Sequence, residues 1–339
     1  MNGRLENELK IQNESLLILE KLPKYVLNWY YNMVASDMSA SSCKDYVMKV
    51  YRFLSYINNN VINIKTEDIT EDIVQKYMIS IRTKKTKAGI VETSDSYRHT
   101  IWYCLNNFLG YLCSHGLIEK NYMINIKKGK NNDLQRINQN RILLTEKEFK
   151  RIICAAKTYE INNKLGRQSV TFSERDVAII ELFMTTGMRE SALANINIDD
   201  INFNDMSLTI IDKGDIMHKC FMSDELATTI SNWIDEREYY VEDKNIKTNA
   251  LFISEKGNRI STDAIYDMIK KYTKIALGKE LSPHKLRAGF ISILYKKTKD
   301  IEFCRRAVGH SNIATTQRYI TTSNKEKEES MNIMTSLIG

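Results

Sequence analysis

Five short stretches in the second half of the chain combine arginine, lysine, histidine and tyrosine, the side chains that phosphoryl transfer would use. In chain order they are Thr186-Gly-Met-Arg-Glu-Ser-Ala-Leu, Asp212-Lys-Gly-Asp, Ser282-Pro-His-Lys-Leu-Arg, Val308-Gly-His-Ser and Thr316-Gln-Arg-Tyr-Ile. Stabilising a pentacoordinate phosphate without a metal requires groups that keep their positive charge. Arginine does so and offers a planar fork to two oxygens. We therefore expect Arg189 and Arg287 to bind a phosphate.

The Ser-Pro-His-Lys-Leu-Arg stretch predicts the start of a helix. His284 and Arg287 are three residues apart, so one helical face presents both. Ser282 would be the capping residue and Pro283 would occupy the first turn. The N–H groups of that first turn would also favour a bound phosphate.

Tyr319 is the candidate nucleophile, selected from 18 tyrosines by its position. It would end a short helix, and His310 stands just before that helix after Gly309, so a turn would bring both side chains to one phosphate. A phenol has a pKa of about 10, so its attack needs a base or deprotonation coupled to the phosphate. Lys213 occupies the tip of a β-turn, and Lys219 is the alternative lysine if the hairpin register differs.

Taken in order, the arginine, the hairpin lysine, HxxR, GH and a tyrosine nine residues later resemble the catalytic motifs of the tyrosine site-specific recombinases, the phage and transposon integrase family. The best-matched region is 145–322. The resemblance implies a 3′-phosphotyrosyl intermediate, strand exchange through a Holliday junction, and neither cofactor nor metal. It makes Lys213 the general acid for the 5′-oxygen leaving group. The catalytic residues that it implies are Arg189, Lys213, His284, Arg287, His310 and Tyr319.

One position departs from the family pattern. The family commonly carries an acidic residue three positions after the first arginine, where it buttresses the site. Here Ala192 stands at that position, and Glu190 directly follows the arginine. Either Glu190 or a distant carboxylate would take that role, or the site is held less rigidly. All six principal positions keep competent side chains, so we expect an active enzyme.

The elements that would position these residues are mostly helices. Apolar spacing predicts amphipathic helices around residues 25–33, 46–57, 70–81 and 97–112. Further helices are expected from Thr145, from Ser173 to Gly187, and from about residue 262 to the end. The period changes at 201–203, 208–211 and 219–222, which predicts short strands. The expected fold class is therefore mainly α with a small antiparallel β-sheet.

A chain of 339 residues is long enough for two domains. Residues 1–120 would form a helical core-binding domain and 144–322 the mixed α/β catalytic domain, joined by a basic linker over 121–143. The resemblance implies that the two domains form a C-shaped clamp on duplex DNA. The remaining tail, 323–339, ends in a short apolar face that would either pack on a neighbouring protomer or fray.

Composition fits a globular protein that binds a polyanion. The net charge is +7, and two clusters supply candidate DNA contacts. These contacts are Lys84, Lys85, Lys87, Lys127, Lys128 and Lys130. The six cysteines are scattered without a CxxC pair, which argues against a structural zinc site and fits a reducing cytoplasm. No stretch of 18 apolar residues suggests a membrane span.

The expected function is site-specific recombination of double-stranded DNA by a homotetramer on two duplexes, with accessory DNA-bending or directionality proteins as further partners. Two features favour integration or excision of a mobile element. These are the opening 22 residues and the difference between this sequence and those typical of Xer recombinases. An Xer-type chromosome or plasmid dimer resolvase is the alternative. A type IB topoisomerase and a DNA-binding regulator without strand exchange also stay open.

Overall fold

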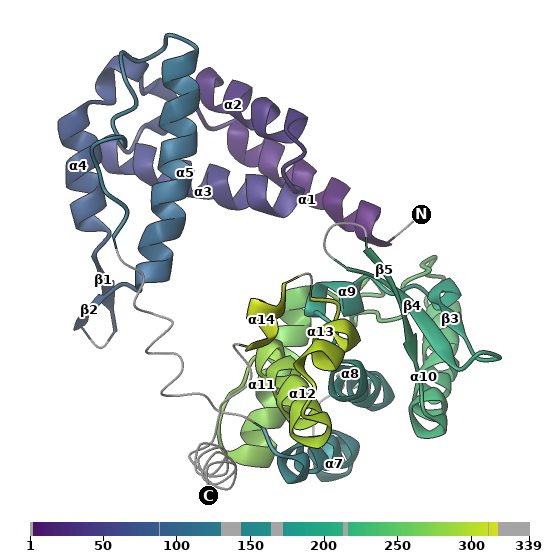
Figure 1. The fold of residues 1–339 in the computed structure, drawn as a ribbon. Coiled ribbons are helices and arrows are strands. Elements are labelled where there is room, and N and C mark those ends of the chain that lie inside the picture. Colours follow the sequence, from purple (N-terminus) through teal and green to yellow (C-terminus); the bar gives the residue numbers. More distant parts are fainter. Residues whose placement is uncertain are drawn as a thin grey trace, which may run out of the picture. The chain divides into compact units, whose positions relative to one another are not determined.

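The computed structural model describes residues 3–87, 89–129, 144–163, 172–212, 216–310 and 312–317. Contacts divide the chain into two compact units, Leu5–Asn140 and Arg141–Gly339. Helices dominate both, and the strands found in the described residues form two small antiparallel sheets, which confirms the expected fold class (Figure 1). None of the helices in this part of the chain has the length and hydrophobicity that a membrane span requires.

The first unit is a small helical bundle with one β-hairpin. Its elements are α1 (Gly3–Leu19), α2 (Lys24–Ala35), α3 (Ala40–Ile57), the short 3₁₀ turns Val61–Asn63 and Thr66–Asp68, α4 (Glu71–Ser80), β1 (Thr83–Thr86), β2 (Gly89–Glu92) and α5 (Asp95–Ser114). The predicted apolar stripes meet in its core, where Trp29, Phe53 and Phe108 are fully buried. The sequence predicted α2 to α5, whereas α1 and the hairpin were not expected.

Residues 121–129 correct part of the predicted linker. Met123 is fully buried in the core of the first unit. The indole N–H of Trp102, on α5, donates to the carbonyl of Ile126 at 2.7 Å, and the ring of His99 hydrogen-bonds with the carbonyl of Gly129 at 2.6 Å. This segment therefore packs against α5, because its apolar residues complete the core. The rest of the predicted linker, 130–143, lies outside the described residues.

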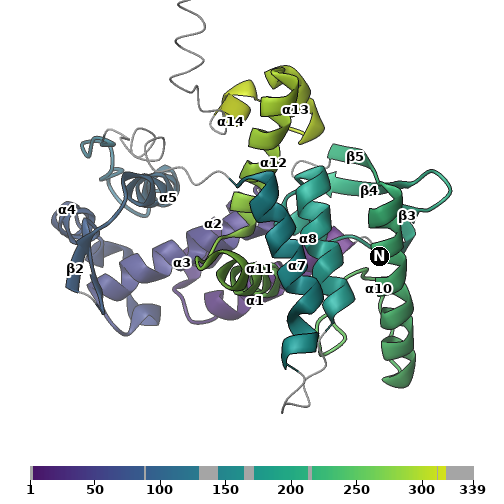
Figure 2. The same cartoon turned by 90° about the horizontal axis from the view of Figure 1, so that it is seen from below.

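In the second unit one helix is buried among several others, and a small sheet lies beside this group of helices (Figure 2). Its elements are α7 (Glu146–Asn163), α8 (Ser173–Thr186), α9 (Glu190–Ala194), the 3₁₀ turn Ile198–Asp200, β3 (Ile201–Asn202), β4 (Ser207–Asp212), β5 (Ile216–Phe221), α10 (Asp224–Asp243), α11 (Thr262–Leu277), α12 (Pro283–Thr298), α13 (Ile301–Ala307) and α14 (Ile313–Gln317). The strands pair in the order β3-β4-β5, as predicted for a small antiparallel sheet. Helix α10 was not expected from the sequence.

Helix α8 is the centre of this unit. It packs against α7, α10 and α12, and its residues Ile179, Ile180 and Leu182 are fully buried. Because α8 packs against three helices, its C-terminal end is held in place, and the segments that follow it start from a defined position. Helices α13 and α14 follow α12 and pack on one another at its end (Figure 1).

Candidate active site and DNA-binding surface

The end of α8 turns the chain toward a cavity. Gly187 adopts a left-handed conformation, with φ of 60°, and its N–H donates to the carbonyl of Phe183 at 3.1 Å. A Cβ at Gly187 would lie 2.4 Å from the ring of Phe290, so only glycine fits this turn. Two residues later the chain is extended at Arg189, the residue that precedes α9. After this turn, Arg189 lines the cavity.

The start of α12 supplies the second part of the site. The helix begins at Pro283 after Ser282, as the sequence predicts, but the Ser282 side chain makes no capping hydrogen bond. The Ser282 carbonyl instead accepts from the N–H of Lys285 at 2.8 Å. His284 and Arg287 lie on one face of the helix, and Arg287 is buried while His284 is exposed.

A cavity of about 290 Å³ brings these segments together. It is lined by Phe183, Met188, Arg189, Glu190, Ser191, Pro283, His284, Arg287 and Thr315. Residues that are about 100 positions apart in the chain thus converge, so that three of the six predicted catalytic side chains, Arg189, His284 and Arg287, share one cavity. Thr315 adds a side chain from α14, the helix that precedes the candidate nucleophile.

Arg287 has a structural role in addition to its predicted one. Its side chain is 3% exposed, and its guanidinium donates to the carbonyl of Gly187 at 2.5 Å and to the carbonyl of Val308 at 3.0 Å. It therefore ties the end of α8 to the turn that precedes His310. Guanidinium has five N–H donors, so these two bonds do not exhaust its capacity to bind phosphate.

His310 is fixed against α14. Its side chain is buried, and its Nδ1 hydrogen-bonds with the Oγ1 of Thr316 at 3.0 Å. Its carbonyl accepts from the guanidinium of Arg305 at 2.6 Å. Gly309, just before it, has φ of 64°, and a Cβ there would lie 2.4 Å from the Nε2 of His218 on β5. The hydrogen bond to Thr316 thus orients the His310 ring, while His218 of β5 packs against the turn before it.

The electrostatics of the cavity favour an anion. Partial desolvation, together with the positive charges of Arg287, Lys285 and Arg189, lowers the pKa of His284 below its usual value. The imidazole is therefore neutral near pH 7 and can accept a proton. A phosphate bound among these groups would offset the repulsion and raise that pKa.

The position where the family commonly carries an acidic buttress holds no carboxylate in this chain. Ala192 is buried in α9, and Glu190 is the carboxylate among the cavity-lining residues. Burial raises the pKa of Glu190, and repulsion from Asp263 adds to the effect. Glu190 therefore lies at the cavity wall, and its role as the buttress stays a prediction.

Three predicted residues, Lys213, Tyr319 and Lys130, lie outside the described residues, as does the C-terminal tail. The alternative lysine, Lys219, is on β5, where its Nζ forms an ion pair with Asp205 at 3.1 Å. Sequence reasoning gave no role to His218, Thr316 or Arg305. Thr316 was within a quoted motif, but nothing local signals the contacts that these three side chains make.

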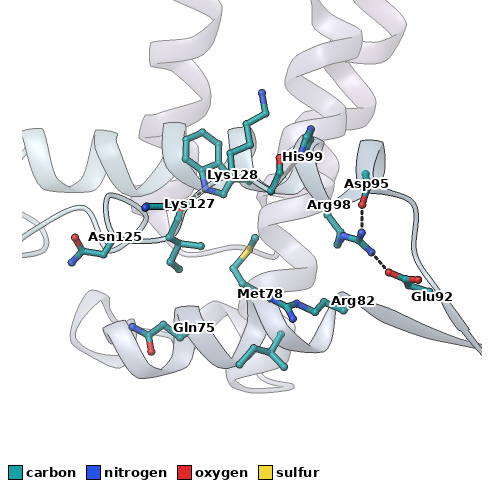
Figure 3. A pocket seen from close by; sticks show the side chains of 14 residues that line it. Gln75, Met78, Arg82, Glu92, Asp95, Arg98, His99, Asn125, Lys127 and Lys128 are labelled. Atoms are coloured by element: carbon teal, nitrogen blue, oxygen red, sulfur yellow. Dashed lines mark hydrogen bonds and ion pairs between the residues drawn. The ribbon is translucent and has the colours of Figure 1, made fainter. Parts of the chain in front are cut away.

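Two of the candidate DNA contacts of the first unit line a groove, and three others lie on or beside strand β1. Lys84 and Lys85 lie on β1, Lys87 lies in the turn after it, and Lys127 and Lys128 line a groove of about 630 Å³ between α4, α5 and the segment after α5 (Figure 3). The Lys128 ammonium contacts the hydroxyl of Tyr103 and lies 4.2 Å from the centre of its ring. Arg82, Arg98 and His99 add further basic side chains to the groove.

Arg189, His284 and Arg287 converge beside the N-terminus of α12, an arrangement that suits the binding of a phosphate group. The comparisons agree: the chain belongs to the phage integrase family of tyrosine site-specific recombinases, whose family model matches residues 143–326. The tyrosine recombinase XerC of Caldanaerobacter subterraneus subsp. tengcongensis is 37% identical over 165 residues, 48% of this chain and 45% of that protein. XerC of Histophilus somni is 26% identical over 304 residues, 87% of this chain and 91% of that protein.

Solved structures share the fold at low sequence identity. The XerH site-specific recombinase bound to its difH substrate matches with a TM-score of 0.59 and 18% identity, over 87% of this chain and 79% of that one. A lambda integrase dimer bound to a COC′ core site matches with a TM-score of 0.59 and 14% identity, over 89% and 96%. The Tn1549 transposon integrase with transposon right end DNA gives a TM-score of 0.58 and 15% identity, over 91% and 99%.

Proposed function

We propose that this tyrosine recombinase cleaves and rejoins duplex DNA with Tyr319 as nucleophile, in the cavity between the end of α8 and the start of α12. The observation that carries the proposal is the convergence of Arg189, His284 and Arg287 on that cavity. Tyr319 follows α14 by two residues, and α14 contributes Thr315 to the same cavity wall.

The chemical step transfers one phosphoryl group from the 5′-oxygen of DNA to the oxygen of Tyr319. Neutral His284 takes the phenolic proton of Tyr319, whose oxygen attacks the scissile phosphorus. The bond from phosphorus to the 5′-oxygen then breaks, and Lys213 gives that oxygen a proton, leaving a free 5′-hydroxyl and a 3′-phosphotyrosyl enzyme. Arg189 and Arg287 stabilise the added charge on the pentacoordinate phosphate. One ester replaces another, so rejoining needs no external energy source.

The partner is double-stranded DNA, contacted by the lysine clusters of the first unit. We place four copies of the chain on two duplexes, because exchange needs one cleaved strand from each partner and a second pair of cuts. One solved relative is a lambda integrase tetramer bound to a Holliday junction, with a TM-score of 0.56. Lys84, Lys85, Lys87, Lys127, Lys128 and Lys130 would contact phosphates, which orient the protein without reading sequence.

The biological role that we propose is integration or excision of a mobile element in the cytoplasm. Relatives named XerC support a second candidate, the resolution of chromosome or plasmid dimers. A supercoiled plasmid with two copies of the target site tests the class of activity. Exchanged products support recombination, relaxation alone would indicate a topoisomerase, and binding without either would indicate a regulator. Recombination between an element end and a separate target, rather than between two identical sites, would support the mobile element.

A further inference from the structure

The hairpin β1–β2 of the first unit has no core of its own. Thr83 pairs with Glu92 and Thr86 with Gly89, and every residue of both strands is exposed. An isolated two-stranded hairpin is marginally stable in water. Something at its base must therefore hold it in place.

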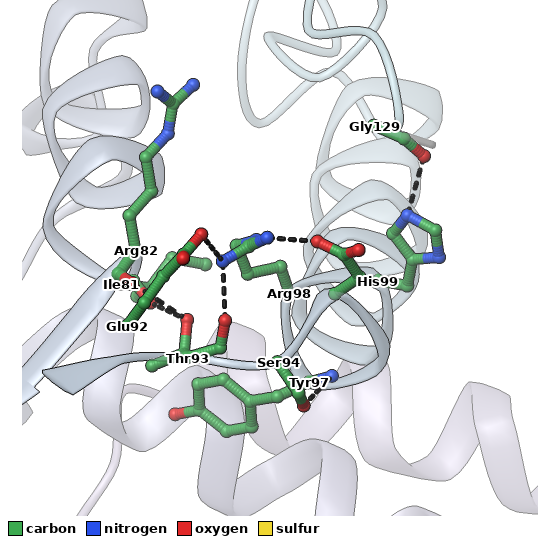
Figure 4. A network of polar contacts seen from close by, with 10 residues as sticks. Ile81, Arg82, Glu92, Thr93, Ser94, Tyr97, Arg98, His99 and Gly129 are labelled. Carbon is green, nitrogen blue, oxygen red and sulfur yellow. Dashed lines mark hydrogen bonds and ion pairs between the residues drawn. The ribbon is translucent and has the colours of Figure 1, made fainter. Parts of the chain in front are cut away.

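A network of polar contacts anchors that base (Figure 4). The buried hydroxyl of Thr93 donates to the carbonyl of Ile81 at 2.7 Å, and the Thr93 N–H donates to the carbonyl of Arg82 at 2.8 Å, both at the end of α4. Arg98, on α5, donates to the Thr93 carbonyl at 2.5 Å and to the Glu92 carboxylate at 3.2 Å. The hairpin is thus fixed to two helices at one end and projects from them at the other.

Each face of the hairpin carries one cation and one apolar side chain. Directly paired residues point to the same face, so Lys85 shares a face with Ile90, and Lys84 shares the other with Val91. Ile90 is 70% exposed and Val91 is 37% exposed. Lys87 adds a charge at the turn. Strand β1 therefore supplies the cations and β2 the apolar side chains, one of each on either face.

The basic surface continues from the hairpin into the groove beside its base. Arg82 follows α4 and lines that groove together with Lys127 and Lys128 (Figure 3). The strands hold one acidic residue, Glu92, and the groove adds Asp95. Arg98 pairs with both carboxylates, and Arg82, Lys127 and Lys128 keep the groove net basic. A polyanion is the partner whose charge complements this surface.

We infer that β1–β2 lies in the major groove of duplex DNA, with Lys84 and Lys85 on the phosphates that border it and Ile90 on the base edges. This inference rests on the proposed function and adds a mode of recognition to it. The major groove has the width to admit a two-stranded ribbon, and it exposes the thymine methyl group, an apolar partner for an exposed isoleucine. Phosphate contacts would set the position of the hairpin, while Ile90 would contribute sequence preference.

The test compares variants of the full chain on duplexes that the wild-type protein selects from a random-sequence pool. For K84Q/K85Q, the slope of log affinity against log salt should become shallower by about two, because each phosphate contact contributes about 0.9. Ile90→Ser should keep the wild-type slope, lose roughly tenfold affinity for the selected duplex, and relax preference at one or two A·T pairs. Lys244→Gln, an exposed lysine at the end of α10, is the control for loss of a charge.

Dimethyl sulfate protection locates the contact, because the reagent methylates guanine N7 in the major groove. Wild-type protein should protect guanines that K84Q/K85Q leaves reactive. If the hairpin variants show the same salt slope, sequence preference and protection pattern as Lys244→Gln, the inference about the hairpin is wrong while the proposed function stands. A wild-type protein that binds no duplex would overturn the proposed function together with it. Thermal unfolding should be unchanged in all variants, since the altered side chains are exposed.

Discussion

Replacing Arg287 tests the dual role that the structure gives this side chain. Its guanidinium joins the carbonyl of Gly187 to the carbonyl of Val308 and lies in the wall of the proposed phosphate site. Arg287→Ala removes both bonds and the charge. Arg287→Lys keeps the charge but replaces the planar fork by one compact ammonium. The two variants therefore separate stability from catalysis.

The magnitudes follow from the two carbonyls. A buried polar group left without its partner costs about 1–3 kcal/mol, so Arg287→Ala should lower the free energy of unfolding by about 4 kcal/mol. In a domain of this size each kcal/mol shifts Tm by roughly 2–4 °C, which gives a fall of about 12 °C. Arg287→Lys can still reach one carbonyl and should lose about 2 kcal/mol. Its cleavage rate should fall about 100-fold, because the forked contact with phosphate is gone.

Urea unfolding and single-turnover cleavage of a nicked duplex measure the two effects. Arg306→Lys is the matched control, because this arginine lies exposed on α13, and it should leave both values unchanged. If Arg287→Ala unfolds at the wild-type urea concentration, the guanidinium does not connect α8 to the turn before His310. If Arg287→Lys unfolds as expected but cleaves at the wild-type rate, Arg287 does not bind the phosphate.

Three further predictions concern the same site. Gly309→Ala should lower the free energy of unfolding by about 2 kcal/mol, because an alanine in the left-handed conformation is strained and its Cβ would clash with His218. In urea unfolding, G309A/H218A should regain only the part of this loss that comes from the clash. The free energy of unfolding should fall as the pH drops below 6.5, because the pKa of His284 is lowered in the folded protein and the unfolded chain therefore binds a proton at this histidine first. His284→Gln should flatten this pH dependence, and a variant with the wild-type pH profile would contradict the lowered pKa. Thr316→Val should slow cleavage about tenfold, because it removes the hydrogen bond to His310, while DNA retardation on a native gel stays unchanged. Thr316→Ser keeps the hydroxyl and should cleave at the wild-type rate. Equal rates in the wild-type protein and both variants would show that this bond does not position the histidine.

Local signals allowed much of the site to be predicted from sequence. Gly187 ends α8 because a left-handed residue there suits glycine, and Pro283 starts α12 because its fixed φ suits a first turn. The spacing of His284 and Arg287 then places both on one helical face. Helix α10 carried a similar signal, since Ser223 caps it by accepting from a backbone N–H, although helices were expected only from about residue 262 onward.

Contacts between distant residues could not be predicted from one sequence. Arg287 and Gly187 are 100 positions apart, and no local pattern states that a guanidinium will meet that carbonyl. The packing of His218 on Gly309 is of the same kind. The hairpin β1–β2 escaped prediction for another reason: its exposed lysine-rich strands bury no face, so they lack the alternation that identifies a strand.

Covalent capture of DNA shows whether Tyr319 is the nucleophile. A nicked duplex carrying the site that the protein selects is incubated with wild-type protein and with Tyr319→Phe, both in EDTA, and the products are separated on a denaturing gel. We expect a protein–DNA adduct with wild-type protein that disappears in Tyr319→Phe, because the phenolic oxygen forms the bond. An adduct that persists in Tyr319→Phe, or no adduct from wild-type protein that retards the same duplex, would contradict this expectation.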